Sequence, residues 1–134
     1  MPAAAVLKIE TSTLEDDCAV LALARYLGLP YLEVLQTACL LTRQPLNGLT
    51  TKQMKAVALT LGTRLKVVRT FDPNTTYGIV LLEDHCAVLW NGLVFEYDAT
   101  VLKWEVWLPL HLTVNKKGIP ERPSLLVEAK THPR

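Results

Sequence analysis

Residues 84–98 have the sequence DHCAVLWNGLVFEYD, in which two apolar runs flank the dipeptide Asn91-Gly92. Asn-Gly between two such runs is a strong signal for a β-hairpin that is closed by a two-residue type I′ turn. If these two residues form the turn, Trp90 pairs with Leu93, and the numbers of every further pair of opposite residues also sum to 183. The stretch therefore predicts two antiparallel strands in a fixed register.

This register places polar residues at the open end of the hairpin. His85 is expected opposite Asp98, and Cys86 opposite Tyr97. Directly opposite residues have Cβ atoms roughly 4.5–5.5 Å apart, and an aspartate at that distance fixes the tautomer of a histidine and stabilises its charged form. Successive side chains of a strand point to opposite faces, so Cys86 is expected to point away from His85 into the core. Taken alone, His85 and Asp98 also fit a simple polar pair at a strand end near solvent.

Helix signals precede the strand signals along the chain. Helices are expected at 18–27, at 31–41 and after Thr50, which has capping-box spacing to Gln53. Strands are expected at 64–69, 78–82, 85–90, 93–98 and 102–108. This order predicts an α+β fold with N-terminal helices packed on a mostly antiparallel C-terminal sheet. Residues 115–134 contain three prolines, and we expect a partly loose tail there, with at most an edge strand.

Length and composition fit a single domain over residues 1–134. Half of the 134 residues are hydrophobic, 20% are charged, and the net charge is +1, so the chain lacks the basic excess of a nucleic-acid-binding protein. No signal peptide or membrane-spanning run is recognisable. The three cysteines are odd in number and irregularly spaced, which favours a reducing, cytoplasmic compartment over a disulfide framework. Neither zinc-ligand spacing nor a nucleotide-binding glycine motif is present, so we expect no metal and no cofactor.

Cys18 is the best candidate nucleophile among the three cysteines. It lies at the expected start of an apolar helix, after two aspartates, and the unpaired N–H groups of a helix N-terminus favour the thiolate. With His85 as base and Asp98 as orienting group, Cys18 would complete a catalytic triad. The alternative is that Cys18 is a small buried hydrophobic residue, which is what we expect of Cys39 in the middle of the second helix.

Three stretches together resemble the bacteriocin-processing, papain-like cysteine peptidases, which cleave leader peptides after a double glycine. The stretches are DDCAVLALARYLGLPYLEVLQ at 16–36, GLTTKQMKAVALTLGTRLKVVR at 48–69 and HCAVLWNGLVFEYDAT at 85–100. They match the family in order, spacing and element type over roughly residues 10–100. The resemblance implies a papain-like fold with Cys18 as nucleophile, His85 as general base and Asp98 as third member. It also implies a peptide or protein substrate and hydrolysis of a peptide or isopeptide bond.

The chain departs from this family at the residue that assists the oxyanion. The family usually has a Gln about six residues before the cysteine, whereas this chain has Ser12. Stabilisation of the oxyanion would then fall to the backbone N–H of Cys18, helped by Ser12.

Two other interpretations stay open. The NlpC-type and CHAP-type cell-wall amidases or endopeptidases share the cysteine-at-helix and histidine-on-strand layout, and their third residue is more often His, Asn or Glu. The other interpretation is a degenerate papain-like module that binds a peptide or protein partner without cutting it, and the missing Gln is its best support.

Overall fold

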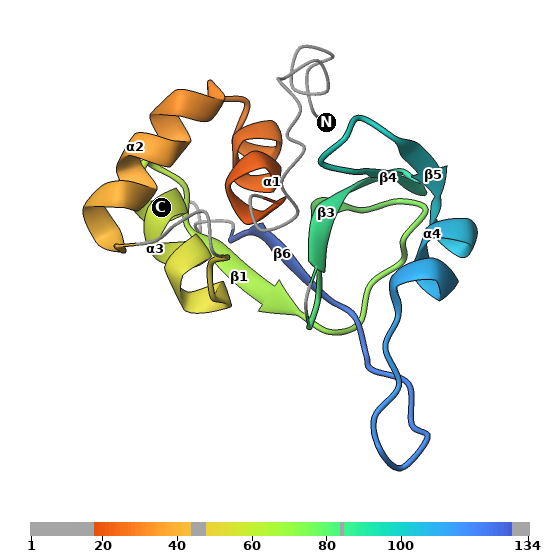
Figure 1. Ribbon diagram of the computed structural model, residues 1–134. Coiled ribbons are helices and arrows are strands. Elements are labelled where there is room, and N and C mark those ends of the chain that lie inside the picture. The colour runs from red at the N-terminus through yellow and green to blue at the C-terminus, as the bar shows by residue number, and fades with distance from the viewer. Residues whose placement is uncertain (1–17, 44–47, 84, 130–134) are drawn as a thin grey trace, which may run out of the picture.

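The computed structural model describes residues 18–43, 48–83 and 85–129, and these residues have an α+β architecture (Figure 1). The described helices are α1 (Cys18–Leu27), α2 (Tyr31–Leu41), α3 (Thr51–Thr60) and α4 (Trp104–His111). The described strands are β1 (Leu65–Val68), β2 (Tyr77–Leu82), β3 (His85–Trp90), β4 (Leu93–Phe95), β5 (Val101–Lys103) and β6 (Ser124–Glu128). All neighbouring strands are antiparallel, in the order β1-β6-β2-β3-β4-β5. The α+β prediction is therefore confirmed.

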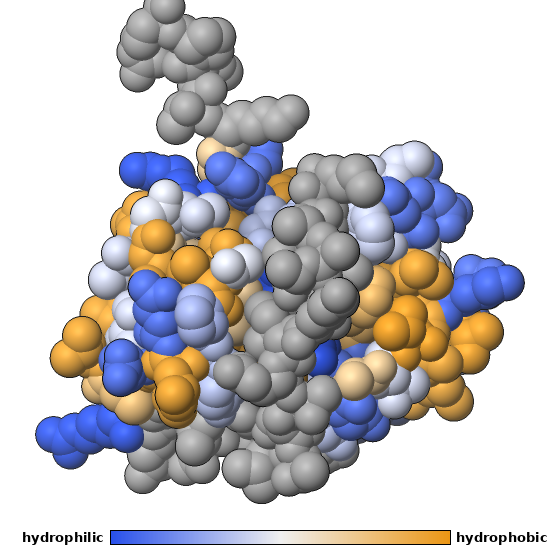
Figure 2. All heavy atoms as spheres, turned by 90° about the horizontal axis from the view of Figure 1, so that it is seen from above, coloured by the Kyte–Doolittle hydropathy of each residue, from blue (hydrophilic) through white to orange (hydrophobic). Residues whose placement is uncertain are grey.

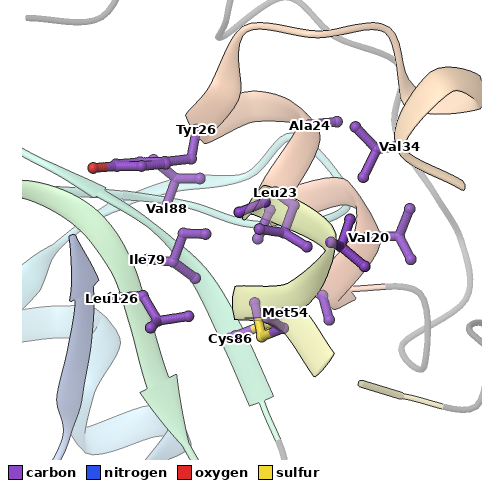
Figure 3. Packing of buried hydrophobic residues seen from close by; sticks show 14 of the residues in the cluster. Val20, Leu23, Ala24, Tyr26, Val34, Met54, Ile79, Cys86, Val88 and Leu126 are labelled. Atoms are coloured by element: carbon purple, nitrogen blue, oxygen red, sulfur yellow. The ribbon is translucent and has the colours of Figure 1, made fainter. Parts of the chain in front are cut away.

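Helices cover the sheet on both faces. α1, α2 and α3 pack on one face, where their apolar side chains meet Ile79 and Val88 (Figures 1 and 3). α4 covers the other face, where Trp107 packs with Val80 and Leu89. Alternate residues of β2 and β3 thus belong to different cores, as the two-residue period of a strand requires.

α1 is the most deeply buried helix. Its residues from Ala19 to Tyr26 are all buried, as expected for a helix that is apolar nearly all round. The one charged residue, Arg25, donates a hydrogen bond from its guanidinium to the backbone oxygen of Glu96. Packing and this bond fix α1 against the hairpin, so Cys18 at its first position has a defined place relative to β3.

The hairpin turn has the predicted type. Asn91 and Gly92 have φ angles of 48° and 82°, and a type I′ turn requires positive φ at both positions. The β3–β4 pairs are Trp90 with Leu93, Leu89 with Val94, and Val88 with Phe95. The predicted register is thus confirmed near the turn. β4 ends at its third residue, however, and the ladder does not extend to His85.

Residues 102–108, which were expected to form a strand, are mostly helical. β5 is short, and α4 follows it directly. A strand was predicted because Leu102, Trp104 and Val106 occupy alternate positions, which is the two-residue period of a strand. Large side chains also recur at 104, 107, 108 and 111, which is the i, i+3, i+4, i+7 pattern of a helix. Trp107 is completely buried, so packing on the sheet decides in favour of the helix.

The C-terminal region contributes a central strand. β6 pairs with β1 on one side and with β2 on the other, and Leu125 and Leu126 are completely buried. The expectation of a loose tail with at most an edge strand is therefore wrong for residues 124–128. A short continuous apolar run is typical of a strand covered on both faces.

The buried face of α2 also differs from the prediction. Val34, Thr37 and Ala38 are buried, whereas Cys39 is exposed. The expectation of a buried Cys39 was wrong because α2 is apolar on several sides, and its packing against α1 and α3 selects one of them.

Large apolar side chains also occur on the surface. Leu40 is 83% exposed and Leu110 is 67% exposed. Figure 2 shows hydrophobic atoms in several patches on one side of the molecule, interrupted by hydrophilic atoms. Among the described residues, no helix has the length and apolar character needed to cross a membrane.

Gly78 in β2 offers a test of the central position of β6. A Cβ atom at Gly78 would lie 2.7 Å from the backbone oxygen of Leu126 and 2.8 Å from Cγ of Leu125. We expect Gly78→Ala to lower the free energy of unfolding by about 1–3 kcal/mol, because the overpacked strands must shift. Urea denaturation measures this change. If β6 did not lie beside β2, alanine would suit the strand better than glycine, so an equal or higher stability would contradict the observed strand order.

Candidate active site

A buried carboxylate, that of Glu96, lies at the centre of a polar cluster. Its Oε1 and Oε2 atoms lie 2.7 and 2.8 Å from Nε2 of His85. Oε2 also accepts a hydrogen bond of 2.6 Å from Nε1 of Trp107 and lies 3.1 Å from Nε2 of His111. Burial raises the pKa of Glu96, but the hydrogen bonds with His85 and Trp107 outweigh it, and the net change is downward. Glu96 is therefore ionised at neutral pH.

β3, β4 and α4 bring these side chains together. Glu96 directly follows β4 and shares the α4 side of the sheet with Val94, two residues earlier. Trp107 and His111 are four residues apart on α4, so they lie on the same side of that helix. The ring of His111 stacks on that of His85, with centroids 4.7 Å apart and an angle of 7° between the planes.

Cys18 approaches His85 from α1. It is partly exposed, and its Sγ atom lies 3.3 Å from Sγ of Cys86. The hydrogen bond with Cys86 is the largest influence and lowers the pKa of Cys18, burial raises it, and a hydrogen bond with His85 lowers it further, to about 5. Because the thiolate is the nucleophilic form of cysteine, Cys18 is in its reactive state at neutral pH.

His85 connects the thiolate to the carboxylate. Burial disfavours the charged ring, but hydrogen bonds with Cys18 and Glu96 outweigh burial and raise the pKa of His85 to about 10. Since Nε2 faces Glu96, Nδ1 is the ring nitrogen available to Cys18. The lowered pKa of Cys18 and the raised pKa of His85 favour a thiolate beside an imidazolium, with the carboxylate of Glu96 bonded to the ring.

Cys86 belongs to the core and contacts Cys18 from there. It is 6% exposed and lies in the core formed with α1 and α3 (Figure 3). Contact with Cys18 and burial both raise the pKa of Cys86, so its thiol stays protonated and donates to the Cys18 thiolate. The predicted separation of Cys86 from His85 by strand alternation fits this placement, whereas the contact with Cys18 was not predicted.

Asp98 does not bond to His85. Its Oδ1 atom accepts a 3.0 Å hydrogen bond from the backbone N–H of Thr100, and bonding to Thr100 lowers the pKa of Asp98. After β4 the chain turns through Ala99, which has a φ of 70°, and this turn ends the ladder before Asp98 can face His85. The expected His85–Asp98 pair was therefore wrong, and Glu96 occupies the place beside the ring.

The register itself contained a signal for Glu96. In the predicted pairing, Glu96 lies opposite Ala87, on the same face as His85 and two pairs nearer the turn. Diagonal neighbours on one face are roughly 7–8 Å apart, which is within reach of a long side chain. The predicted oxyanion residue Ser12 lies outside the described residues, so its role stays a prediction.

A hollow of about 330 Å³ opens over the α4 side of His85. Its lining consists of His85, Glu96, Tyr97, Asp98, Thr100, Leu102 and His111. It gives access to the imidazole and the carboxylate, whereas Cys18 lies on the α1 side of the ring.

His85, Glu96 and His111 form the group of described residues that could hold a metal ion, since their ligand atoms lie within 4.8 Å of one another. A metal would need the free electron pair of a neutral His85 ring, whereas pairing with Cys18 and Glu96 favours the protonated ring. The Trp107 N–H, which can only donate, already occupies Oε2 of Glu96. A hydrogen-bonded network therefore fits these contacts better than a metal centre.

No family model, curated protein or solved structure matches the chain. The grounds for a function are therefore the contacts of Cys18, His85 and Glu96 themselves.

The different surroundings of Glu96 and Asp98 can be tested by paired amide substitutions. We expect Glu96→Gln to lower the free energy of unfolding by about 1.5–3 kcal/mol, because the buried ring donors lose a charged acceptor. Asp98→Asn should cost less than about 0.5 kcal/mol, because asparagine preserves the exposed turn. Urea denaturation at pH 7 measures both values. A larger loss for Asp98→Asn than for Glu96→Gln would show that Asp98 is the residue that supports His85.

Proposed function

We propose that the chain is a cysteine hydrolase that cleaves a peptide or isopeptide bond, with Cys18 as nucleophile, His85 as general acid and base, and Glu96 as orienting residue. The observation that carries the proposal is the place of His85: its Nε2 atom contacts the carboxylate of Glu96, and Cys18 and His85 shift each other's pKa in opposite directions. Enzymes that hydrolyse through a covalent intermediate typically have a nucleophile beside a base, and the base is held by a third, orienting group.

In the proposed reaction, the Cys18 thiolate attacks the carbonyl carbon of the substrate. The protonated His85 gives its proton to the leaving amine, and a thioester forms on Cys18. Water then attacks the thioester while His85 accepts a proton from it, and the acid product leaves with the thiolate restored. Glu96 fixes the ring orientation and stabilises the imidazolium that is present before and after each cycle.

The start of α1 supplies a place for the negative charge that develops on the carbonyl oxygen. The first N–H groups of a helix have no acceptor within the helix, and Cys18 is the first residue of α1. Its backbone N–H would donate to the oxyanion, as Ser12 would if it lies beside the thiol.

A papain-like fold is part of the proposal. Its support is the succession of a cysteine at the first residue of a helix, a histidine at the first residue of a strand, and a carboxylate just after the next strand. The α+β architecture and the antiparallel sheet are compatible with that fold.

A cell-wall amidase or endopeptidase of NlpC or CHAP type is the second candidate. Its specific support is Glu96, since the third residue of those enzymes is more often His, Asn or Glu than Asp. The same chemistry would then act on the peptide part of peptidoglycan rather than on a leader peptide or another protein.

The ionisation of Cys18 gives a first test that needs no substrate. In a Cys39→Ala background, which removes the exposed thiol, we expect alkylation of Cys18 by iodoacetamide to reach half of its maximal rate near pH 5, because its pKa is lowered to about 5. His85→Ala and Cys86→Ala should each move this midpoint upward, since each removes a partner that lowers the pKa of Cys18. A midpoint near pH 9 that His85→Ala leaves unchanged would contradict the proposed triad.

Hydrolysis itself is tested with a peptide library and with purified peptidoglycan, followed by mass spectrometry. We expect cleavage that Cys18→Ala abolishes and Cys39→Ala leaves intact, with turnover lowered by about 10²–10⁴-fold in His85→Ala. Cleavage of library peptides favours the leading proposal, and release of fragments from peptidoglycan alone favours the second candidate. Failure to cleave either material, together with binding of a peptide that Cys18→Ala retains, would contradict both and favour a non-cutting module.

A further inference from the structure

The sulfur atoms of Cys18 and Cys86 are in direct contact although the residues are 68 positions apart. Their Sγ atoms are 3.3 Å apart, and both cysteines are free. A disulfide bond is about 2.05 Å long, so the sulfurs need to approach by about 1.3 Å. Small side-chain rotations at the first residue of α1 and the second residue of β3 supply movements of that size.

The two thiols differ in access and in ionisation. Cys18 is partly exposed, whereas Cys86 is 6% exposed and packed in the core. The pKa of Cys18 is lowered, mainly by Cys86, whereas that of Cys86 is raised. A small oxidant therefore meets a thiolate at Cys18 first, and Cys86 stays shielded from it.

We propose that Cys18 and Cys86 form an oxidative modification site, at which a peroxide oxidises Cys18 and Cys86 then resolves the product into an intramolecular disulfide. This inference does not depend on the proposed hydrolysis, because it needs only the two sulfur atoms and a peroxide.

The proposed reaction balances in two steps. The Cys18 thiolate attacks one oxygen of hydrogen peroxide, the O–O bond breaks, and Cys18 sulfenic acid and hydroxide form. The Cys86 sulfur then attacks the sulfenic sulfur, an S–S bond forms and the S–O bond breaks. The hydroxide that leaves combines with the Cys86 proton to give water. The Cys18 thiolate and the Cys86 thiol lose two electrons in total. One peroxide is reduced to one water and one hydroxide, and this hydroxide takes a proton from the solvent to become the second water.

The disulfide has two consequences for the molecule. It removes the nucleophile reversibly, since a reducing thiol restores both cysteines. It also protects Cys18 from the irreversible sulfinic and sulfonic acids, because the resolving thiol is already in contact with the oxidised sulfur. Cys86 would thus serve the site in two states, as a hydrogen-bond donor when reduced and as a covalent partner when oxidised.

Peptide mapping of the full-length chain tests this proposal. The Cys39→Ser protein is treated with one equivalent of hydrogen peroxide, blocked with iodoacetamide and digested without reductant. We expect a cross-linked pair of peptides carrying Cys18 and Cys86, a loss of about 2 Da from the intact chain, and loss of Cys18 alkylation that dithiothreitol restores. In the Cys86→Ala variant, Cys18 should instead gain two or three oxygen atoms.

The proposal is overturned if Cys18 gains oxygen atoms, or links to a second chain, while Cys86 remains free in the otherwise native protein. It is also overturned if Cys18 resists over-oxidation equally well in the Cys86→Ala variant and in the protein that retains Cys86. Because mapping of the protein with both cysteines decides between a disulfide and over-oxidation, the test stands even if Cys86→Ala does not fold. The outcome of this test is also independent of the hydrolysis assays, because those assays use reduced protein.

Discussion

The organisation of the site depends on the buried carboxylate of Glu96. A buried charge is costly unless it is hydrogen-bonded, and this carboxylate is hydrogen-bonded by His85 from β3 and by Trp107 from α4, with Nε2 of His111 3.1 Å away. The backbone oxygen of the same residue accepts the hydrogen bond from Arg25 of α1. One residue thereby joins the helix that begins at Cys18, the strand that begins at His85, and the helix on the opposite face of the sheet.

Features that depend on neighbours in sequence could be predicted. The bounds of α1 follow from a continuous apolar segment that ends at a glycine, and the hairpin turn follows from Asn91-Gly92. Where β4 ends is a local feature that was still missed, because the turn has its positive φ at Ala99, a residue type that rarely adopts it, and so lacks the usual glycine or asparagine signal. Because β4 ends at this turn, the partner of His85 is Glu96 and not Asp98.

Features that depend on distant parts of the chain were missed. β6 lies between β1 and β2, although β3, β4, β5 and α4 separate it from β2 along the chain. The buried side of α2 is selected by α1 and α3, so Cys39 is exposed. The contact between Cys18 and Cys86 likewise arises only when α1 packs on β3, and no residue spacing in the sequence predicts it.

The central claim is that His85 is a protonated ring between the Cys18 thiolate and the Glu96 carboxylate at neutral pH. The nitrogen-15 chemical shifts of the His85 ring, measured by NMR on the reduced wild-type protein at pH 8, test it most directly. With the pKa of His85 raised to about 10, both ring nitrogens should have the shifts of a protonated imidazolium. A neutral ring at pH 8, with one unprotonated nitrogen and a titration near the ordinary value of about 6.5, would contradict the account.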